Sequence, residues 1–135
     1  MWTSLGIAYG CVLWIHAFGC AGFGHGSYLP YMIYGAPFSI LPVPGLLFIC
    51  PIWWGWLGWT FSKQQFKAAA TLLGLHTVVT AFVLIINLPA GDDLAYLHRI
   101  EGAMPAWVWT GFMLYLFGII FSCTKTFYLF RSKNK

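Results

Sequence analysis

The sequence predicts an all-α membrane protein whose four transmembrane helices form an up-and-down bundle. Two observations lead to this fold class. First, 60% of the 135 residues are hydrophobic and only 7% are charged, whereas soluble domains carry about 25% charged residues. Second, the chain contains four apolar stretches close to the length, about 20 residues, that a helix needs to cross a bilayer. The outer surface of the protein is therefore expected to contact lipid.

The composition also excludes other classes of protein. The apolar content is too high for a disordered chain, and seven basic residues are too few for a nucleic-acid-binding module. The four cysteines show no paired spacing, which argues against a disulfide-stapled secreted domain. We therefore expect the lipid bilayer to surround the chain, and we expect no nucleic-acid partner.

The first predicted span covers residues 5–23. It contains no charged residue, and His16 is its only strongly polar side chain. No Lys or Arg precedes it, and residues 17–19 are a poor lipoprotein cleavage motif ahead of Cys20. The segment is thus predicted to remain as a transmembrane helix rather than to be removed as a signal peptide.

The second and third spans are predicted at residues 44–61 and 68–88. The stretch 44–61 is the shorter one and contains Pro51. The stretch 68–88 has the clearest bounds, because Lys67 precedes it and Pro89 stops it.

The fourth span is predicted at residues 105–124. Pro105 occupies a favourable first helical position, and Lys125 meets the water at the far end. Before this span, apolar residues recur at every third position of residues 92–101, which predicts a short amphipathic helix on the outer leaflet. No internal repeat or linker divides the chain, so residues 1–135 are predicted to form a single domain.

Basic residues gather on one side of the predicted spans. Six of the seven lie between spans two and three or after span four, and only Arg99 lies on the opposite side. The six are Lys63, Lys67, Lys125, Arg131, Lys133 and Lys135. Because short loops rich in Lys and Arg stay in the cytoplasm, both termini are predicted to be cytoplasmic, and the expected location is the inner membrane of a bacterium. The basic tail is also placed to contact anionic lipid.

Tryptophans cluster near the ends of two predicted spans. They are Trp53, Trp54, Trp56 and Trp59 in the second span and Trp107 and Trp109 in the fourth. Because the amphipathic indole ring prefers the headgroup level, this pattern predicts an aromatic belt at each membrane interface. A substrate-binding aromatic box is the alternative interpretation.

The first candidate site is the pair His16 and His76, since an ionisable side chain at membrane depth is costly and often functional. Counted along the predicted helices, the two imidazoles differ by about 5 Å in height. They could therefore bind the iron of one haem b from opposite faces, with Gly19 and Gly74 leaving room for the macrocycle. The competing interpretation is two histidines that only form hydrogen bonds inside the bundle, because the spans offer no Lys or Arg for the haem propionates.

The second candidate site is a polar set on the outer face that contains every acidic residue. Imidazole and carboxylate groups suit zinc, copper or another divalent ion. The spacing matches no established ligand motif, so solvated loop charges are the alternative. The set consists of His25, Asp92, Asp93, His98 and Glu101.

Small residues recur at spacings that allow close helix contact in lipid. This pattern serves either packing within the chain or contact with a helix of a partner. The positions are Gly6 and Gly10, Ala17 and Ala21, Gly22 and Gly26, Gly55 and Gly58, and Gly111 and Gly118.

The leading functional hypothesis is a non-enzymatic accessory or structural subunit, which packs against other transmembrane helices of a complex or of its own copies. No catalytic motif appears, and no charged residue lies within a span. One alternative is a quinone-linked b-type cytochrome that uses His16 and His76. Another is a small permease or channel component, suggested by helix-breaking and polar positions in spans two and three. Those positions are Pro42, Pro44, Pro51, Thr77, Thr80 and Asn87.

Overall fold

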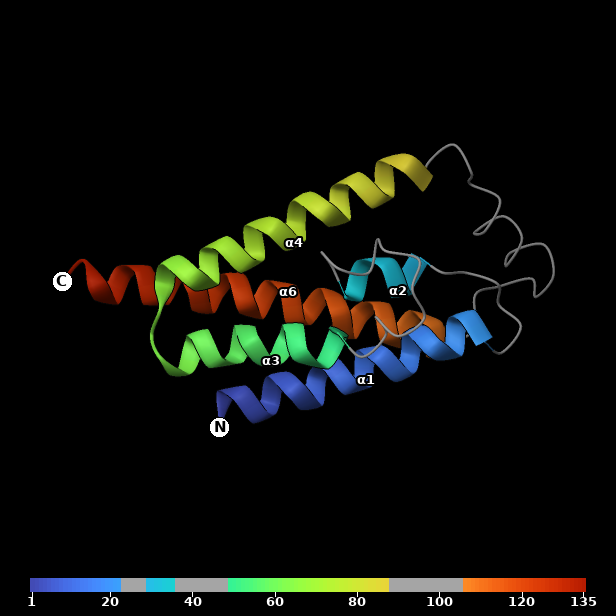
Figure 1. The fold of residues 1–135 in the computed structure, drawn as a ribbon, viewed down its shortest axis with the longest axis horizontal. Helices are drawn as coiled ribbons and strands as arrows, with labels where there is room; N and C mark the ends of the chain where they lie inside the picture. The colour runs from blue at the N-terminus through green and yellow to red at the C-terminus, as the bar shows by residue number, and fades with distance from the viewer. Residues whose placement is uncertain (23–28, 36–48, 88–105) are drawn as a thin grey trace.

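The computed structural model describes residues 1–22, 29–35, 49–87 and 106–135, and every regular element in these ranges is an α-helix. The prediction of an all-helical fold is confirmed for this part of the chain (Figure 1). The helices are α1 (Trp2–Gly22), α2 (Leu29–Tyr34), α3 (Ile49–Ser62), α4 (Phe66–Asn87) and α6 (Ala106–Lys133).

Three of these helices are long and apolar enough to cross a bilayer. The qualifying segments are Trp2–Cys20, Phe66–Ile86 and Ala106–Lys133, which match the first, third and fourth predicted spans. Large apolar side chains such as Ile15, Val78 and Phe117 are exposed on their outward faces. The chain is therefore a helical, multi-pass membrane protein whose outer surface contacts lipid.

Helix α3 is shorter than the second predicted span. Its 14 residues extend about 21 Å, less than the roughly 30 Å of the hydrocarbon core. Residues 44–48 of the predicted span lie outside the described residues. Pro51 lies in the first turn of α3, where the missing N–H group breaks no helical hydrogen bond, so it does not interrupt the helix.

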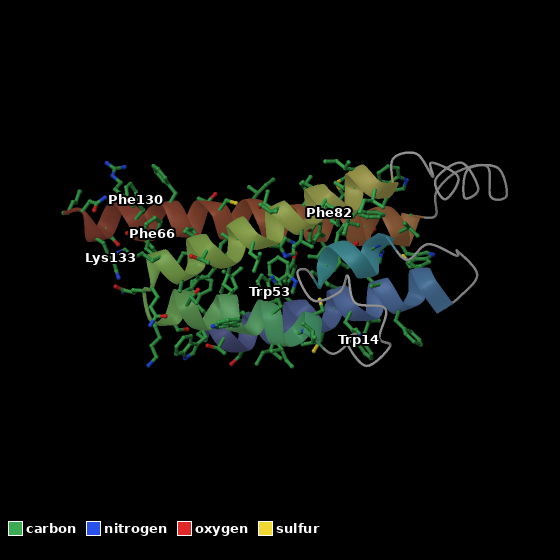
Figure 2. All side chains as sticks on the ribbon, turned by 45° about the horizontal axis from the view of Figure 1, so that its top comes forward. Trp14, Trp53, Phe66, Phe82, Phe130 and Lys133 are labelled. Atoms are coloured by element: carbon green, nitrogen blue, oxygen red, sulfur yellow. The ribbon has the colours of Figure 1, made fainter. Side chains whose placement is uncertain are left out.

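Helix α6 continues beyond residue 124, where the fourth span was predicted to end. Its 28 residues run to Lys133 because basic side chains in a last turn interact favourably with the helix dipole. The rings of Phe130 and Phe66 lie 4.9 Å apart and join this extension to the start of α4. Figure 2 shows both phenylalanines near Lys133 at one end of the bundle.

The start of α1, the turn between α3 and α4 and the end of α6 lie at the same end of the molecule (Figure 1). The hydroxyl oxygens of Thr3 and Ser62 are 3.5 Å apart there, and the Lys125 ammonium group lies 4.9 Å from the centroid of the Trp2 ring. We call this region the basic end, because it carries the six basic residues named above.

The turn from α3 to α4 is a Schellman motif, a common helix C-terminus. The Gln65 N–H group donates to the Thr60 carbonyl at 2.9 Å, and the Gln64 N–H group donates to the Phe61 carbonyl at 3.2 Å. Gln64 has a φ of 52°, in the left-handed region that this motif requires and that favours glycine. The turn directs α4 back along α3.

The tightest contact in the bundle is between α1 and α3, which run in opposite directions. A Cβ atom added to Gly10 would lie 2.5 Å from the Pro51 Cα atom, and one added to Gly6 would meet the Trp54 carbonyl oxygen. On the other helix, a Cβ atom on Gly55 would lie 2.6 Å from the Ile7 side chain, and one on Gly58 would meet the Trp2 backbone. These glycines therefore serve packing within the chain.

The glycines of α6 make room for side chains of α1. A Cβ atom on Gly111 would overlap the His16 ring, and one on Gly118 would overlap the Tyr9 hydroxyl group. Ala17 of α1 is buried, whereas Gly26 lies outside the described residues. For Gly111 and Gly118 too, packing within the chain is confirmed.

Candidate functional site

Six aromatic side chains form a hydrogen-bonded group where the helices meet, and we call it the buried network. Trp53, labelled in Figure 2, lies near the middle of the bundle. The members come from all five described helices. They are His16 of α1, Tyr34 of α2, Trp53 and Trp54 of α3, His76 of α4 and Tyr115 of α6.

His76 has a defined hydrogen-bonding direction. The Trp53 indole N–H group lies 3.1 Å from His76 Nδ1, and because indole nitrogen only donates, Nδ1 must accept. A neutral imidazole then carries its proton on Nε2 and donates it to the Tyr115 hydroxyl oxygen, 2.7 Å away. Tyr115 in turn donates to the Ile33 carbonyl at 3.4 Å. His76 is therefore a neutral imidazole that connects Trp53 of α3 to Tyr115 of α6.

The second half of the network holds α2. The Tyr34 hydroxyl oxygen lies 3.1 Å from His16 Nδ1, and the Tyr34 carbonyl accepts from the Trp54 indole at 2.9 Å and from the Cys50 thiol at 3.6 Å. A helix of six residues leaves its last carbonyl groups without helical partners. In this bundle, side chains of α3 and α6 supply those partners.

The two histidines are separated by two tyrosine rings. Ring centroids lie 5.6 Å apart for His16 and Tyr34, 4.8 Å for Tyr34 and Tyr115, and 5.9 Å for Tyr115 and His76. His16 Nε2 is also 3.8 Å from Cys20 Sγ. Haem ligation by His16 and His76 stays a prediction, and ligation through His76 Nε2 requires Tyr115 to leave that nitrogen.

A reduced-minus-oxidised visible spectrum of the purified protein checks the haem prediction, since two imidazole ligands give sharp bands. Of the glycines expected to admit the macrocycle, Gly74 is exposed while His76 is buried. Gly74 thus lies on a different face of α4. Gly19 lies against the Trp107 ring, which would be 3.5 Å from an added Cβ atom.

The predicted outer metal set lies wholly outside the described residues, as do the predicted amphipathic helix at 92–101 and residues 23–28 and 36–48. His25, Asp92, Asp93, His98 and Glu101 therefore stay predictions. Within the ranges that the structure describes, no group of three or more His, Cys, Asp or Glu residues is placed to hold a metal ion.

The aromatic-belt prediction is wrong for two tryptophans. Trp53 and Trp54 are each only 3% exposed, and their indole groups donate within the bundle rather than to lipid headgroups. Trp56 is 48% exposed and Trp59 is 41% exposed, which fits an interfacial position. The two pairs differ because they face opposite sides of α3.

Three tyrosines were missed as candidate residues. Tyr34 and Tyr115 connect the histidines, and the Tyr9 hydroxyl group bridges α1 to α6 by donating to the Leu114 carbonyl at 3.1 Å. The signal that could have found them is a phenol within an apolar stretch, since a buried hydroxyl group needs a hydrogen-bond partner.

Of the polar positions expected to line a pore, Thr77 and Thr80 of α4 have described side chains. The Thr77 hydroxyl group donates to the Leu73 carbonyl of its own helix at 2.8 Å, whereas the buried Thr80 hydroxyl group has no hydrogen-bond partner among the described residues. The four cysteines, all in described helices, are free thiols.

Hollows also lie between the helices, and the first of them is bordered by Trp54 of the buried network. An apolar cavity of about 300 Å³ lies between α1, α3 and α6, with walls that include Leu5, Leu57, Leu114 and Phe117. A groove of about 460 Å³ lies between α4 and α6. It is lined in part by Phe66, Ala70, Gly74, Thr77, Phe127 and Phe130.

Comparison with known proteins identifies no relative: no protein-family model, no curated protein and no solved structure matches this chain.

Proposed function

We propose that this protein is a non-enzymatic membrane subunit with four spans that assembles through the outward face of α4, and that the partner on this face is a second copy of the chain. The observation that carries the proposal is Gly74. A Cβ atom added there would meet nothing within 4 Å, in contrast to the glycines of the α1–α3 contact. The backbone of α4 is thus open to close approach by another helix.

Gly74 belongs to a row of small residues on α4. Ala70, Gly74, Thr77 and Ala81 follow one another at intervals of four, three and four positions, which places them on one helix face. In lipid, helices associate through packing rather than through the hydrophobic effect, and small residues permit that packing.

A second copy suits this face for two reasons. A two-fold symmetric contact uses the same patch on both chains, and a row of small residues is complementary to itself. In addition, α4 carries no charged side chain after Lys67, so two parallel copies bring no like charges together inside the bilayer.

Four spans and cytoplasmic termini are part of the proposal. The opposite directions of α1 and α3 support an up-and-down arrangement in which α3 and the residues before it form the second span. The six basic residues gather at the basic end (Figure 1), and this supports a cytoplasmic position for that end.

The experiment counts the labelled chains in each nanodisc by single-molecule photobleaching. We expect the parent chain to form dimers. Gly74→Leu should raise the dissociation constant of the dimer on the order of tenfold, so that more of the protein is monomeric. Ala8→Leu, at an exposed small residue of α1, is the matched control and should remain dimeric. A monomeric parent chain would refute the second copy as partner, and co-purification with another membrane protein would assign the face to that chain.

Labelling with a membrane-impermeant thiol reagent tests the orientation. Lys135→Cys should react from the cytoplasmic side only, and Gly102→Cys from the opposite side only. Reaction of both variants from one side would contradict the four-span arrangement.

A further inference from the structure

The apolar cavity between α1, α3 and α6 has the form of a slot that opens sideways to the bilayer. Its floor consists of buried residues of α3, including Trp54 and Leu57. Its rims are Leu5 of α1, which is 53% exposed, and Phe117 of α6, which is 67% exposed. A molecule in the bilayer can therefore enter between α1 and α6 without crossing the core.

The slot is bounded at both ends by contacts that bridge its rims. At the inner end, the Tyr9 hydroxyl group donates to the Leu114 carbonyl. At the basic end, the rings of Trp2 and Phe121 lie 5.7 Å apart. Tyr9 follows Trp2 by seven residues, which corresponds to about 10 Å along α1.

The chemistry of the walls favours an apolar occupant. The Tyr9 hydroxyl group already has acceptors on α6, and Ser122 adds a small buried side chain. Apolar cavities of about 150 Å³ stay dry and take up small hydrocarbons, and this one is about 300 Å³. Glycine also lines it on all three helices, at Gly6, Gly58 and Gly118.

A positive charge is held where the slot meets the basic end. The Lys125 ammonium group lies 4.9 Å from the centroid of the Trp2 ring, a wall of the slot. It also lies 5.6 Å from the Tyr128 ring, so two aromatic faces fix its position. Lys125 follows the wall residue Phe121 by one helical turn. The phosphate of a lipid whose chain enters through the open side of the slot would lie beyond the Trp2–Phe121 contact, at this charge.

We infer that the slot binds one acyl chain of an anionic phospholipid and that Lys125 binds the headgroup phosphate. The site is separate from the face of α4 proposed for assembly, because Gly74 does not line it. A failed test of one proposal therefore leaves the other intact.

Native mass spectrometry in detergent, with dioleoyl phosphatidylglycerol or dioleoyl phosphatidylcholine added, tests the headgroup. The parent chain should retain one phosphatidylglycerol in preference to phosphatidylcholine. Lys125→Gln should weaken this retention about fivefold, the effect of one basic residue near a lipid surface. Lys135→Gln, which removes the same charge elsewhere, should change it little. Equal retention of both lipids, or equal loss in the two variants, would overturn the inference.

Filling the slot tests the acyl chain. Ser122→Leu places a larger side chain in the slot, whereas Thr124→Leu makes a similar change at an exposed position on the same helix. A phosphatidylglycerol with a photoreactive acyl chain should label Leu5, Leu57 or Leu114 in the parent chain. That labelling should be lost in Ser122→Leu and kept in Thr124→Leu. Labelling spread evenly over lipid-facing residues such as Leu75 and Val78 would show surface lipid only and overturn the inference.

Discussion

The α1–α3 pair and helix α4 use glycine in opposite ways. In the pair, Gly10 and Gly55 face another part of the same chain so closely that a single carbon atom would not fit. On α4, Gly74 faces open space. Because small residues in lipid are useful for helix contact, the comparison separates contacts made within the chain from a face left available.

The largest effect is expected inside the pair. Gly10→Leu forces α1 away from the start of α3, and we expect the free energy of unfolding to fall by about 3 kcal/mol, at the upper end for an overpacked core. Titration with a denaturing detergent, followed by circular dichroism, measures the change. Gly74→Leu is the matched comparison and should lose no stability, because an added Cβ atom there meets no internal neighbour. Equal losses would mean that both glycines are internal.

The next effect belongs to the buried network. Tyr115→Phe removes the acceptor of the His76 Nε2–H group and the donor to the Ile33 carbonyl, so the free energy of unfolding should fall by about 1–2 kcal/mol. The same detergent titration applies. Tyr128→Phe, at an exposed tyrosine of the same helix, should have no measurable effect. An equal loss of unfolding free energy in both variants would show that the hydrogen bonds of the buried network are not the cause.

A smaller substitution at Gly74 should raise the stability of the monomer and weaken its self-association. Gly74→Ala improves helix propensity and meets no internal neighbour, so the monomer should gain up to about 1 kcal/mol in stability. The added methyl group should at the same time weaken self-association by separating the two backbones. Detergent titration measures the first quantity and photobleaching in nanodiscs the second. Tighter association would contradict the role given to this face.

The smallest effect is expected at the turn that connects the two regions. Gln64→Gly removes the cost of a left-handed backbone in a residue with a side chain, and we expect about 0.5–1 kcal/mol of added stability. Lys63→Gly, one position earlier and still helical in its hydrogen bonding, should not stabilise. Were both variants destabilised, the Schellman motif would not determine the turn.

Much of the fold could be predicted from the sequence. The thickness of the bilayer sets the length of a span, and charged residues are kept out of the hydrocarbon core and so mark where a span ends. The bounds predicted at 5–23 and 68–88 agree with α1 and α4 to within a few residues. The end of α6 could not be predicted the same way, since a helix continues into water when its last turn carries residues such as Arg131.

The inward faces of the helices were harder to predict. A membrane helix is apolar all round, so Trp53 and Trp56 look alike in the sequence although one is buried and the other exposed. His16 and His76 could be identified as polar groups at membrane depth because their cost in lipid is high. Their tyrosine partners could not. Tyr34 reaches His16 from α2, a segment outside the four predicted spans, and Tyr115 reaches His76 from an apolar span in which no pattern marks it.

The bonding of α2 has a consequence for the order in which the protein matures. The carbonyl groups of Ile33 and Tyr34 take donors from Trp54 and Tyr115, and both donors are synthesised after α2. A backbone carbonyl without a partner is costly in hydrocarbon, and a nascent chain emerges from its N-terminus. Helix α2 therefore completes its hydrogen bonding only after α6 has entered the membrane. A chain truncated before α6 should leave α2 accessible to protease, while α1 and α3 remain packed through their glycines.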